Sequence, residues 1–126
     1  MKRIISTADA PEAVGAYSQA TTDGSLVFTA GQIPMTPDGD LLDDEPIATQ
    51  AEQALSNIEA VLASEGLEMS DVLKMTVYLD DIEDFEAMND TYAGFFDQEP
   101  PARSAVEVAN LPKGVGVEIE AIATSE

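Results

Sequence analysis

The chain has 126 residues, which is the size of one domain with a single hydrophobic core. Hydrophobic residues make up 44% of it and aromatic residues 6%, as is typical of a globular protein. Cysteine, histidine and tryptophan are all absent. These absences exclude a disulfide scaffold, a Cys/His zinc site, a Cys–His dyad and a Ser–His–Asp triad. Any general base must therefore be a carboxylate, a lysine, a tyrosine or a terminal amine.

The charge balance is strongly acidic: 25 Asp and Glu residues stand against 5 Lys and Arg residues, a net charge of −20. Nucleic-acid binding depends on cationic side chains that displace counterions from phosphates, so this balance disfavours a nuclease or RNA-binding role. Self-repulsion also destabilises a compact state at low ionic strength. We therefore expect a halophilic protein that works at high salt, where the Debye length falls to about 3 Å at 1 M. The alternative is an acidic protein of a mesophile.

No stretch approaches the ~20 apolar residues that span a bilayer. The N-terminal residues Met1–Ser6 become polar too early for a signal peptide. We expect a cytoplasmic protein with no membrane partner. Without an internal repeat or a linker, residues 1–126 are predicted to form a single domain.

The first predicted elements are strands. Lys2–Thr7 is a short strand candidate. Tyr17–Thr22 and Ser25–Ala30 flank the dipeptide Asp23-Gly24, which favours the positive φ angles of a tight hairpin turn.

The middle of the chain changes from helical to strand periodicity and back. Apolar residues from Ile47 to Leu62 recur at helical spacing, and Gly66 is a natural stop. The next segment alternates, which predicts a strand whose core side chains are Leu73, Met75, Val77 and Leu79. A second helix follows, and Asp81 or Asp84 can cap it. Its apolar stripe consists of Phe85, Met88, Tyr92, Phe95 and Phe96.

Two more strands complete the chain. Pro100-Pro101 forbids further helix, and Ala102–Ala109 is strand-like. After a turn at Leu111–Gly114, Val115–Ala123 alternates between apolar core residues and an opposite face that carries Glu118 and Glu120. These elements predict an α+β fold with a single mixed β-sheet and two helices packed on one face. A symmetric oligomer that packs sheet against sheet would cover the apolar area left on the other face.

Two side chains are the main candidates for chemistry. Arg103 follows two prolines and enters a strand, and a guanidinium binds a carboxylate through two parallel hydrogen bonds. The alternative for Arg103 is an ion pair with one of the protein's own carboxylates. Glu118 lies among apolar neighbours, where burial would raise its pKa and suit it to proton transfer with water. The alternative for Glu118 is a solvated glutamate on an edge strand.

Other residues give weaker signals. The polar groups near element ends that could contact a ligand are Tyr17, Gln32 and Asn89, whereas Tyr78 and Tyr92 suit core or interface packing. Gly15 and Gly31 are expected to relieve backbone crowding, and neither belongs to a GxGxxG motif or a P-loop.

Several segments resemble one known family. Pro101–Val108, Leu111–Lys113 and Val117–Glu120 are similar to the C-terminal signature of the reactive intermediate deaminase (RidA) family, and so are Gly15–Tyr17, Thr29–Pro34 and Asn89–Tyr92. The resemblance runs from Lys2 to Thr124. It implies a chorismate-mutase-like fold and a homotrimer with sites between subunits.

The resemblance also implies a hydrolase that acts on C–N bonds, a 2-iminobutanoate/2-iminopropanoate deaminase. Such an enzyme converts reactive enamines and imines, such as 2-aminoacrylate, to 2-keto acids and ammonia, which is metabolite damage control, and it uses no cofactor or metal. Arg103 matches the arginine that binds the substrate carboxylate, and Glu118 matches the glutamate that activates water. The positions that match the substrate pocket are Tyr17, Ala30, Gly31 and Asn89, with a backbone contact from Ala105.

The chain departs from the family pattern at three positions. Many members of the family have a cysteine where this chain has Ala105, a serine where it has Ala30 and a proline where it has Ala16. The missing serine hydroxyl affects the expected substrate range and rate, whereas Ala105 keeps its backbone groups.

Two other functions compete with deamination. A non-catalytic module that binds a 2-keto acid or another small carboxylate would need Arg103 but not Glu118. A ribonuclease or translation inhibitor, roles attached to relatives of the family, is opposed by the net charge of −20 and the absence of histidine.

Overall fold

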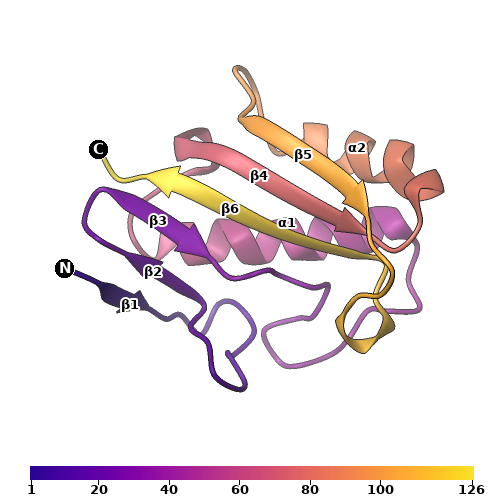
Figure 1. Ribbon diagram of the computed structural model, residues 1–126, viewed down its shortest axis with the longest axis horizontal. Helices are drawn as coiled ribbons and strands as arrows, with labels where there is room; N and C mark the ends of the chain where they lie inside the picture. The colour runs from indigo at the N-terminus through magenta and orange to yellow at the C-terminus, as the bar shows by residue number, and fades with distance from the viewer.

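Six strands form one mixed sheet, and both helices lie against a single face of it (Figure 1). The computed structural model describes residues 1–126. The strands are β1 (Arg3–Ile5), β2 (Ala20–Thr22), β3 (Leu26–Thr29), β4 (Val72–Leu79), β5 (Ala102–Glu107) and β6 (Val117–Thr124). The helices are α1 (Ile47–Ala63) and α2 (Phe85–Ala93). The predicted α+β class, with one mixed sheet and both helices on one side, is confirmed.

The strand order β1-β2-β3-β6-β4-β5 places the C-terminal strand in the middle of the sheet. Only β4 and β5 run parallel, and α2 lies in the crossover between them, as a parallel connection requires. Beyond the end of β3, the chain stays beside β6 through an isolated bridge between Gln32 and Ile119. This bridge brings the segment after β3 alongside the middle of β6. Neither helix has the length and apolar content of a membrane-crossing helix.

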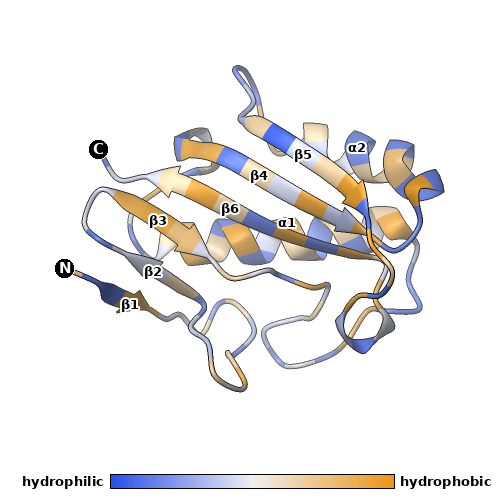
Figure 2. Ribbon diagram, in the orientation of Figure 1, coloured by the Kyte–Doolittle hydropathy of each residue, from blue (hydrophilic) through white to orange (hydrophobic).

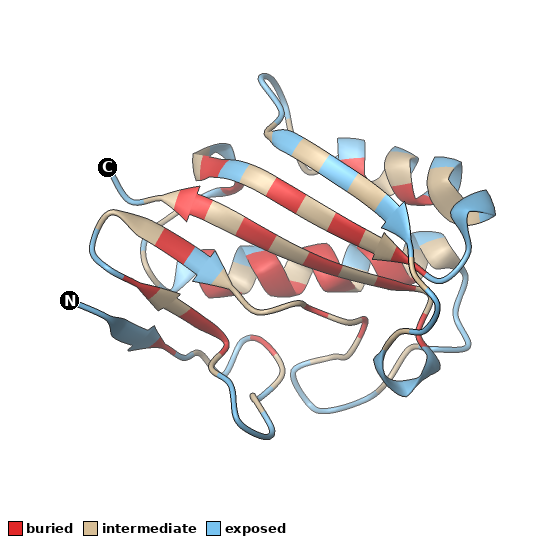
Figure 3. Ribbon diagram, in the orientation of Figure 1, coloured by how far each residue is buried: buried red, intermediate tan, exposed pale blue.

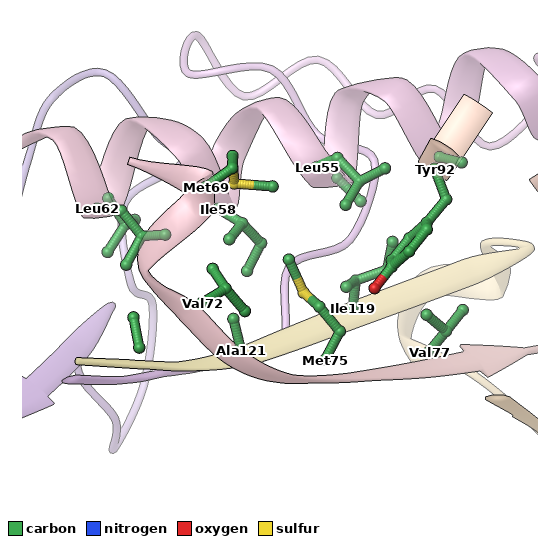
Figure 4. Packing of buried hydrophobic residues seen from close by; sticks show 14 of the residues in the cluster. Leu55, Ile58, Leu62, Met69, Val72, Met75, Val77, Tyr92, Ile119 and Ala121 are labelled. Carbon is green, nitrogen blue, oxygen red and sulfur yellow. The ribbon is translucent and has the colours of Figure 1, made fainter. Parts of the chain in front are cut away.

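The core fills the space between the helices and the sheet. Buried and half-buried residues alternate along β4 and β6, because successive side chains point to opposite faces of a strand (Figure 3). The apolar stripe of α1 packs on the buried side. Figure 4 shows this contact between Leu55, Ile58 and Leu62 of the helix and Met75, Val77, Ile119 and Ala121 of the sheet.

The start of β4 differs from the prediction. Leu73, expected in the core, is 50% exposed, whereas Val72 is 6% exposed and joins the core. The pairing of β4 with β6 shifts register between Val72 and Lys74. An extra residue at such an irregularity reverses which side chains face inward, so the alternation cannot be extended from Met75 back to Leu73.

The second helix is shorter than its apolar stripe. It ends at Ala93, so Phe95 and Phe96 pack against the core from the turn that follows. Of the two predicted caps, Asp81 accepts a hydrogen bond from the Glu83 N–H at 2.9 Å, at the start of the short turn before α2. Asp84 precedes α2 but makes no side-chain cap bond.

The face of the sheet opposite the helices, called the open face below, is uncovered in one chain. It is the face turned to the viewer in Figure 2, where hydrophilic positions interrupt the hydrophobic colour of β6. Ile4 is 61% exposed, Phe28 46% and Val106 44%. The predicted apolar area on this face is therefore present.

Candidate active site

Arg103 lies on β5, directly after the Pro100-Pro101 pair, and faces the helix side of the sheet. Its Nη1 donates a hydrogen bond to Asn89 Oδ1 of α2 at 2.7 Å. Its guanidinium carbon lies 4.7 Å from the ring centroid of Tyr92 and 5.3 Å from that of Phe85. Two aromatic rings and one amide therefore hold the guanidinium in place, and the stacking adds cation–π attraction.

Arg103 has no carboxylate partner, although the chain has 25 acidic residues. The one salt bridge in the protein joins Arg3 to Glu65 at 2.7 Å, far from this site. The ion pair considered above as the alternative for Arg103 is thus not formed. An arginine that is held by neutral groups and keeps free donors is suited to an anion from outside the chain.

A cavity of ≈ 510 Å³ opens beside Arg103, and we call it the arginine pocket. It is lined by Asn89, Tyr92, Ala93, Phe96, Asp97, Pro100, Pro101 and Arg103. Burial raises the pKa of Tyr92, and the nearby Arg103 partly offsets this. Asp97 also lines the cavity but forms no salt bridge with Arg103. The pocket thus combines apolar walls with one free cation, as small-carboxylate sites do.

A second cavity, of ≈ 420 Å³, contains Glu118, and we call it the glutamate pocket. It is lined by Val14, Tyr17, Ala30, Gly31, Ile33, Pro112, Lys113 and Glu118. Three of the predicted substrate contacts, Tyr17, Ala30 and Gly31, thus meet Glu118 here. The hydroxyl of Tyr17 accepts a hydrogen bond from the Val14 N–H at 3.4 Å, and the residue as a whole is 54% exposed.

The carboxyl group of Glu118 is half-buried, and its pKa is raised first by burial and then by the charge of Glu120. Glu120 lies two residues further along β6, on the same face. Tyr78 stands opposite Glu118 on β4, and burial together with the two glutamates raises the pKa of Tyr78. Of the two alternatives for Glu118, the structure supports the partly buried one. Moreover, β6 lies inside the sheet and is not an edge strand.

The two pockets lie on opposite faces of the sheet within one chain. Arg103 pairs in register with Met75, a core residue, and reaches α2 on the helix side. Glu118 alternates with the core residues Val117 and Ile119, so it points to the open face. A single chain therefore does not bring Arg103 and Glu118 together, and a site that uses both must combine two chains.

The remaining predicted residues fall in or beside these pockets. Ala105 lies two residues after Arg103 on the edge strand β5, partly buried against the core. Gly31 faces the Glu118 carboxyl group closely, which confirms that it relieves crowding. Gly15 does not relieve crowding: nothing lies within 4 Å of a Cβ there, and its φ of +116° is what requires glycine.

Two features of the site do not follow from the sequence patterns described above. The sequence places Lys113 in a turn and in the C-terminal signature but gives it no role in a pocket, yet it lines the glutamate pocket with a φ of 57°, unusual for a residue other than glycine. Phe85 and Tyr92 were assigned to the core, yet their rings also support Arg103. The positions of Phe85, Asn89 and Tyr92 at helical spacing were the available signal, because that spacing places them on one face of α2.

Fold and pockets together define a small α+β protein with an unpaired arginine beside one cavity and a half-buried glutamate in another. Comparisons with known proteins identify the family. The sequence profile of the family described as endoribonuclease L-PSP matches residues 7–125. A RutC family protein of Pyrococcus horikoshii is 48% identical over 126 residues, which cover 100% of both chains. The 2-iminobutanoate/2-iminopropanoate deaminase of Escherichia coli is 45% identical over 127 residues, with 98% of each chain covered.

A solved structure agrees with these matches. The crystal structure of Escherichia coli TdcF with bound serine has a TM-score of 0.94 and 44% identity, and the match covers 98% of this chain and 99% of that one. This chain belongs to the endoribonuclease L-PSP family, which includes the reactive intermediate deaminases that its motifs resemble.

Proposed function

We propose that this protein is a 2-iminobutanoate/2-iminopropanoate deaminase that hydrolyses reactive enamines and imines to 2-keto acids and ammonia. The observation that carries the proposal is the unpaired guanidinium of Arg103, fixed by Asn89 and two rings in a chain rich in carboxylates. The relative of that name in Escherichia coli, 45% identical, supports the same reaction. The serine bound to TdcF supports the substrate class, because serine carries a carboxylate beside an amine-bearing carbon.

The complete site combines the arginine pocket of one subunit with the glutamate pocket of another. This arrangement follows from the opposite orientation of Arg103 and Glu118 in one chain. Contact between subunits would also cover the exposed apolar side chains of the open face, Ile4, Phe28 and Val106. We assign a homotrimer, the assembly that the family resemblance implies, with one site at each subunit boundary.

The reaction needs no covalent nucleophile, because an imine carbon is already electrophilic. Arg103 binds the substrate carboxylate through two N–H donors and orients the imine. Water adds to the imine carbon; the Glu118 carboxylate accepts a proton from this water and returns it to nitrogen. In the resulting carbinolamine, Glu118 accepts the hydroxyl proton and donates a proton to the amino group. The C–N bond then breaks, ammonia leaves, and the oxygen forms a double bond to carbon. Tyr17, Ala30, Gly31 and the backbone of Ala105 complete the walls around the substrate.

We also propose that the protein works in a salt-rich cytoplasm. With a net charge of −20 and one salt bridge, between Arg3 and Glu65, nearly all of its acidic side chains lack a cationic partner. Dissolved cations must then screen the repulsion among them. The same charge opposes binding to RNA, so we assign no nuclease activity.

The direct test generates 2-iminobutanoate with a threonine dehydratase and follows its decay in competition with semicarbazide. The wild type should accelerate hydrolysis, and Arg103→Ala should lose about 100-fold or more in kcat/KM, the value of one charge-assisted bidentate contact. Lys2→Gln removes the same charge outside both pockets and should leave the rate unchanged. A wild-type protein that does not accelerate the decay would refute the proposal.

Glu118→Gln separates deamination from simple carboxylate binding. If the protein is an enzyme, this variant should bind 2-ketobutyrate with near wild-type affinity but lose turnover, because binding depends on Arg103. A wild-type protein that binds the keto acid but never accelerates imine hydrolysis would instead be a binding module.

A further inference from the structure

Gly31 occupies an unusual place among the glycines of this chain. It lies just after β3, in the segment that runs beside β6. The next residue, Gln32, is bonded to Ile119 in both directions: the Gln32 N–H donates to Ile119 O at 2.7 Å, and the Ile119 N–H donates to Gln32 O at 3.0 Å. Since β6 is in the middle of the sheet, these two bonds fix the backbone of Gly31 relative to Glu118.

The space in front of Gly31 is filled by the Glu118 side chain. A Cβ atom at Gly31 would lie 2.8 Å from Glu118 Cδ and 3.0 Å from Cγ, and closer still to Oε2. Ordinary contacts of a Cβ atom are 3.4–4 Å. The φ angle of Gly31 is outside the left-handed region, so its backbone conformation is open to other residues. Another residue at this position therefore meets no backbone strain, but its Cβ would have to move the flexible Glu118 side chain.

This contact acts on the functional group of the glutamate pocket and not on the core. The Glu118 carboxyl group lies where a Cβ of residue 31 would be, so the bare backbone of Gly31 is its neighbour on that side. Both Gly31 and Glu118 line the pocket, so the covered carboxyl group still faces the cavity. The contrast is Gly116, where a Cβ would meet Ile47 Cδ1 at 2.9 Å, a crowded position that touches packing and not Glu118.

We propose that Gly31 is a positioning residue whose missing side chain sets the place of the Glu118 carboxyl group in the glutamate pocket. The catalytic consequence of this role rests on the deaminase function proposed above, whereas the contact itself does not. A methyl group at Gly31 must displace the carboxyl group by about 0.5–1 Å to reach an ordinary contact distance. A misplacement of this size costs about 10- to 100-fold in rate.

The test compares Gly31→Ala, Glu118→Asp and the double variant in the imine assay. Gly31→Ala should lower kcat by about 10- to 100-fold while KM changes by no more than about 3-fold, because Arg103 lies in the other pocket. Glu118→Asp shortens the side chain by one methylene and withdraws the carboxyl group from the new methyl. The double variant should therefore be at least about 5-fold more active than the product of the two single effects.

The acid limb of the pH–rate profile gives a second readout. In Gly31→Ala the displaced carboxyl group is more hydrated, so the apparent pKa of the limb should fall toward that of an ordinary glutamate. Gly116→Ala should lower stability but leave this pKa unchanged. A Gly31→Ala enzyme with wild-type kcat and an unshifted acid limb would overturn the proposal.

Two further outcomes are decisive. If Gly31→Ala does not fold, the double variant with Glu118→Asp should fold, because the shorter side chain relieves the overlap; a double variant that is also unfolded overturns the proposal. If the wild type itself lacks deaminase activity, the proposed function fails separately. An NMR titration of the Glu118 carboxyl carbon in the wild type and in Gly31→Ala then tests the contact directly, and an unchanged pKa overturns it.

Discussion

The opposite orientation of Arg103 and Glu118 leads to a quantitative prediction for mixed oligomers. Arg103→Ala loses the carboxylate contact, and Glu118→Gln loses the group that transfers the proton. Each variant alone should retain about 1% of wild-type activity or less, given about 100-fold for a charge-assisted pair and about 10²–10⁴-fold for a general base. Each variant nevertheless keeps one intact pocket. Mixing the two should therefore restore activity only if a site takes its pockets from different chains.

The size of the recovery follows from the geometry. In a random equal mixture, a boundary between subunits meets an intact glutamate pocket with a probability of about one half, and an intact arginine pocket with the same probability. About one quarter of the sites are then complete. The whole population of oligomers in this mixture should show about a quarter of wild-type activity, far above either variant alone.

The assay co-expresses the two chains in equal amounts, purifies the whole population of oligomers, and follows 2-iminobutanoate decay. The control mixes wild type with the double variant Arg103→Ala/Glu118→Gln. Before subunit exchange, about one half of the sites in this control are complete. After random exchange, a complete site needs two neighbouring wild-type subunits, so the activity should fall to about one quarter of wild type. Mixed single variants that stay at the level of the separate variants, while the control shows exchange, would refute the two-chain site.

Three other predictions concern stability. Tyr92→Phe should raise the free energy of unfolding by about 1 kcal/mol in urea titrations, because the Tyr92 hydroxyl is buried without a hydrogen-bond partner; a loss of stability would contradict this. Glu118→Gln should be more stable than the wild type at pH 7 but not below about pH 4. Folding raises the pKa of the Glu118 carboxyl group, so the wild-type protein loses stability as the pH rises from the pKa of this group in the unfolded state to its pKa in the folded state. Equal stability differences at both pH values would show that Glu118 is not desolvated. Finally, the melting temperature should rise with KCl concentration, because salt screens the net charge of −20; a flat or falling curve would refute the high-salt assignment.

Local patterns in the sequence were enough to predict most of the fold. Alternation identified β6 and the later part of β4, and helical spacing identified α1 and α2, because burial on one face imposes these periods on the chain. The pattern failed at Leu73, where a register shift reverses the alternation. Such an irregularity depends on the pairing between two strands and leaves no mark in the residues of one strand.

The candidate site divides in the same way. The sequence by itself determined which groups are available: two arginines, many carboxylates and no histidine or cysteine. It also identified Arg103 and Glu118 by their motifs. Only the tertiary structure decided that Asn89, Phe85 and Tyr92 hold Arg103, and that Glu118 lies on the other side of the sheet.

The close approach of Gly31 to Glu118 was likewise decided by the tertiary structure. The two residues are far apart in the chain, and their backbones are brought together by the pairing of β3 with β6, which the bridge between Gln32 and Ile119 continues. Residue type limits the chemistry a chain can perform, because it fixes the functional groups and their charge. Which groups meet is set by strand order and register, because these alone determine the face and the neighbours of each side chain.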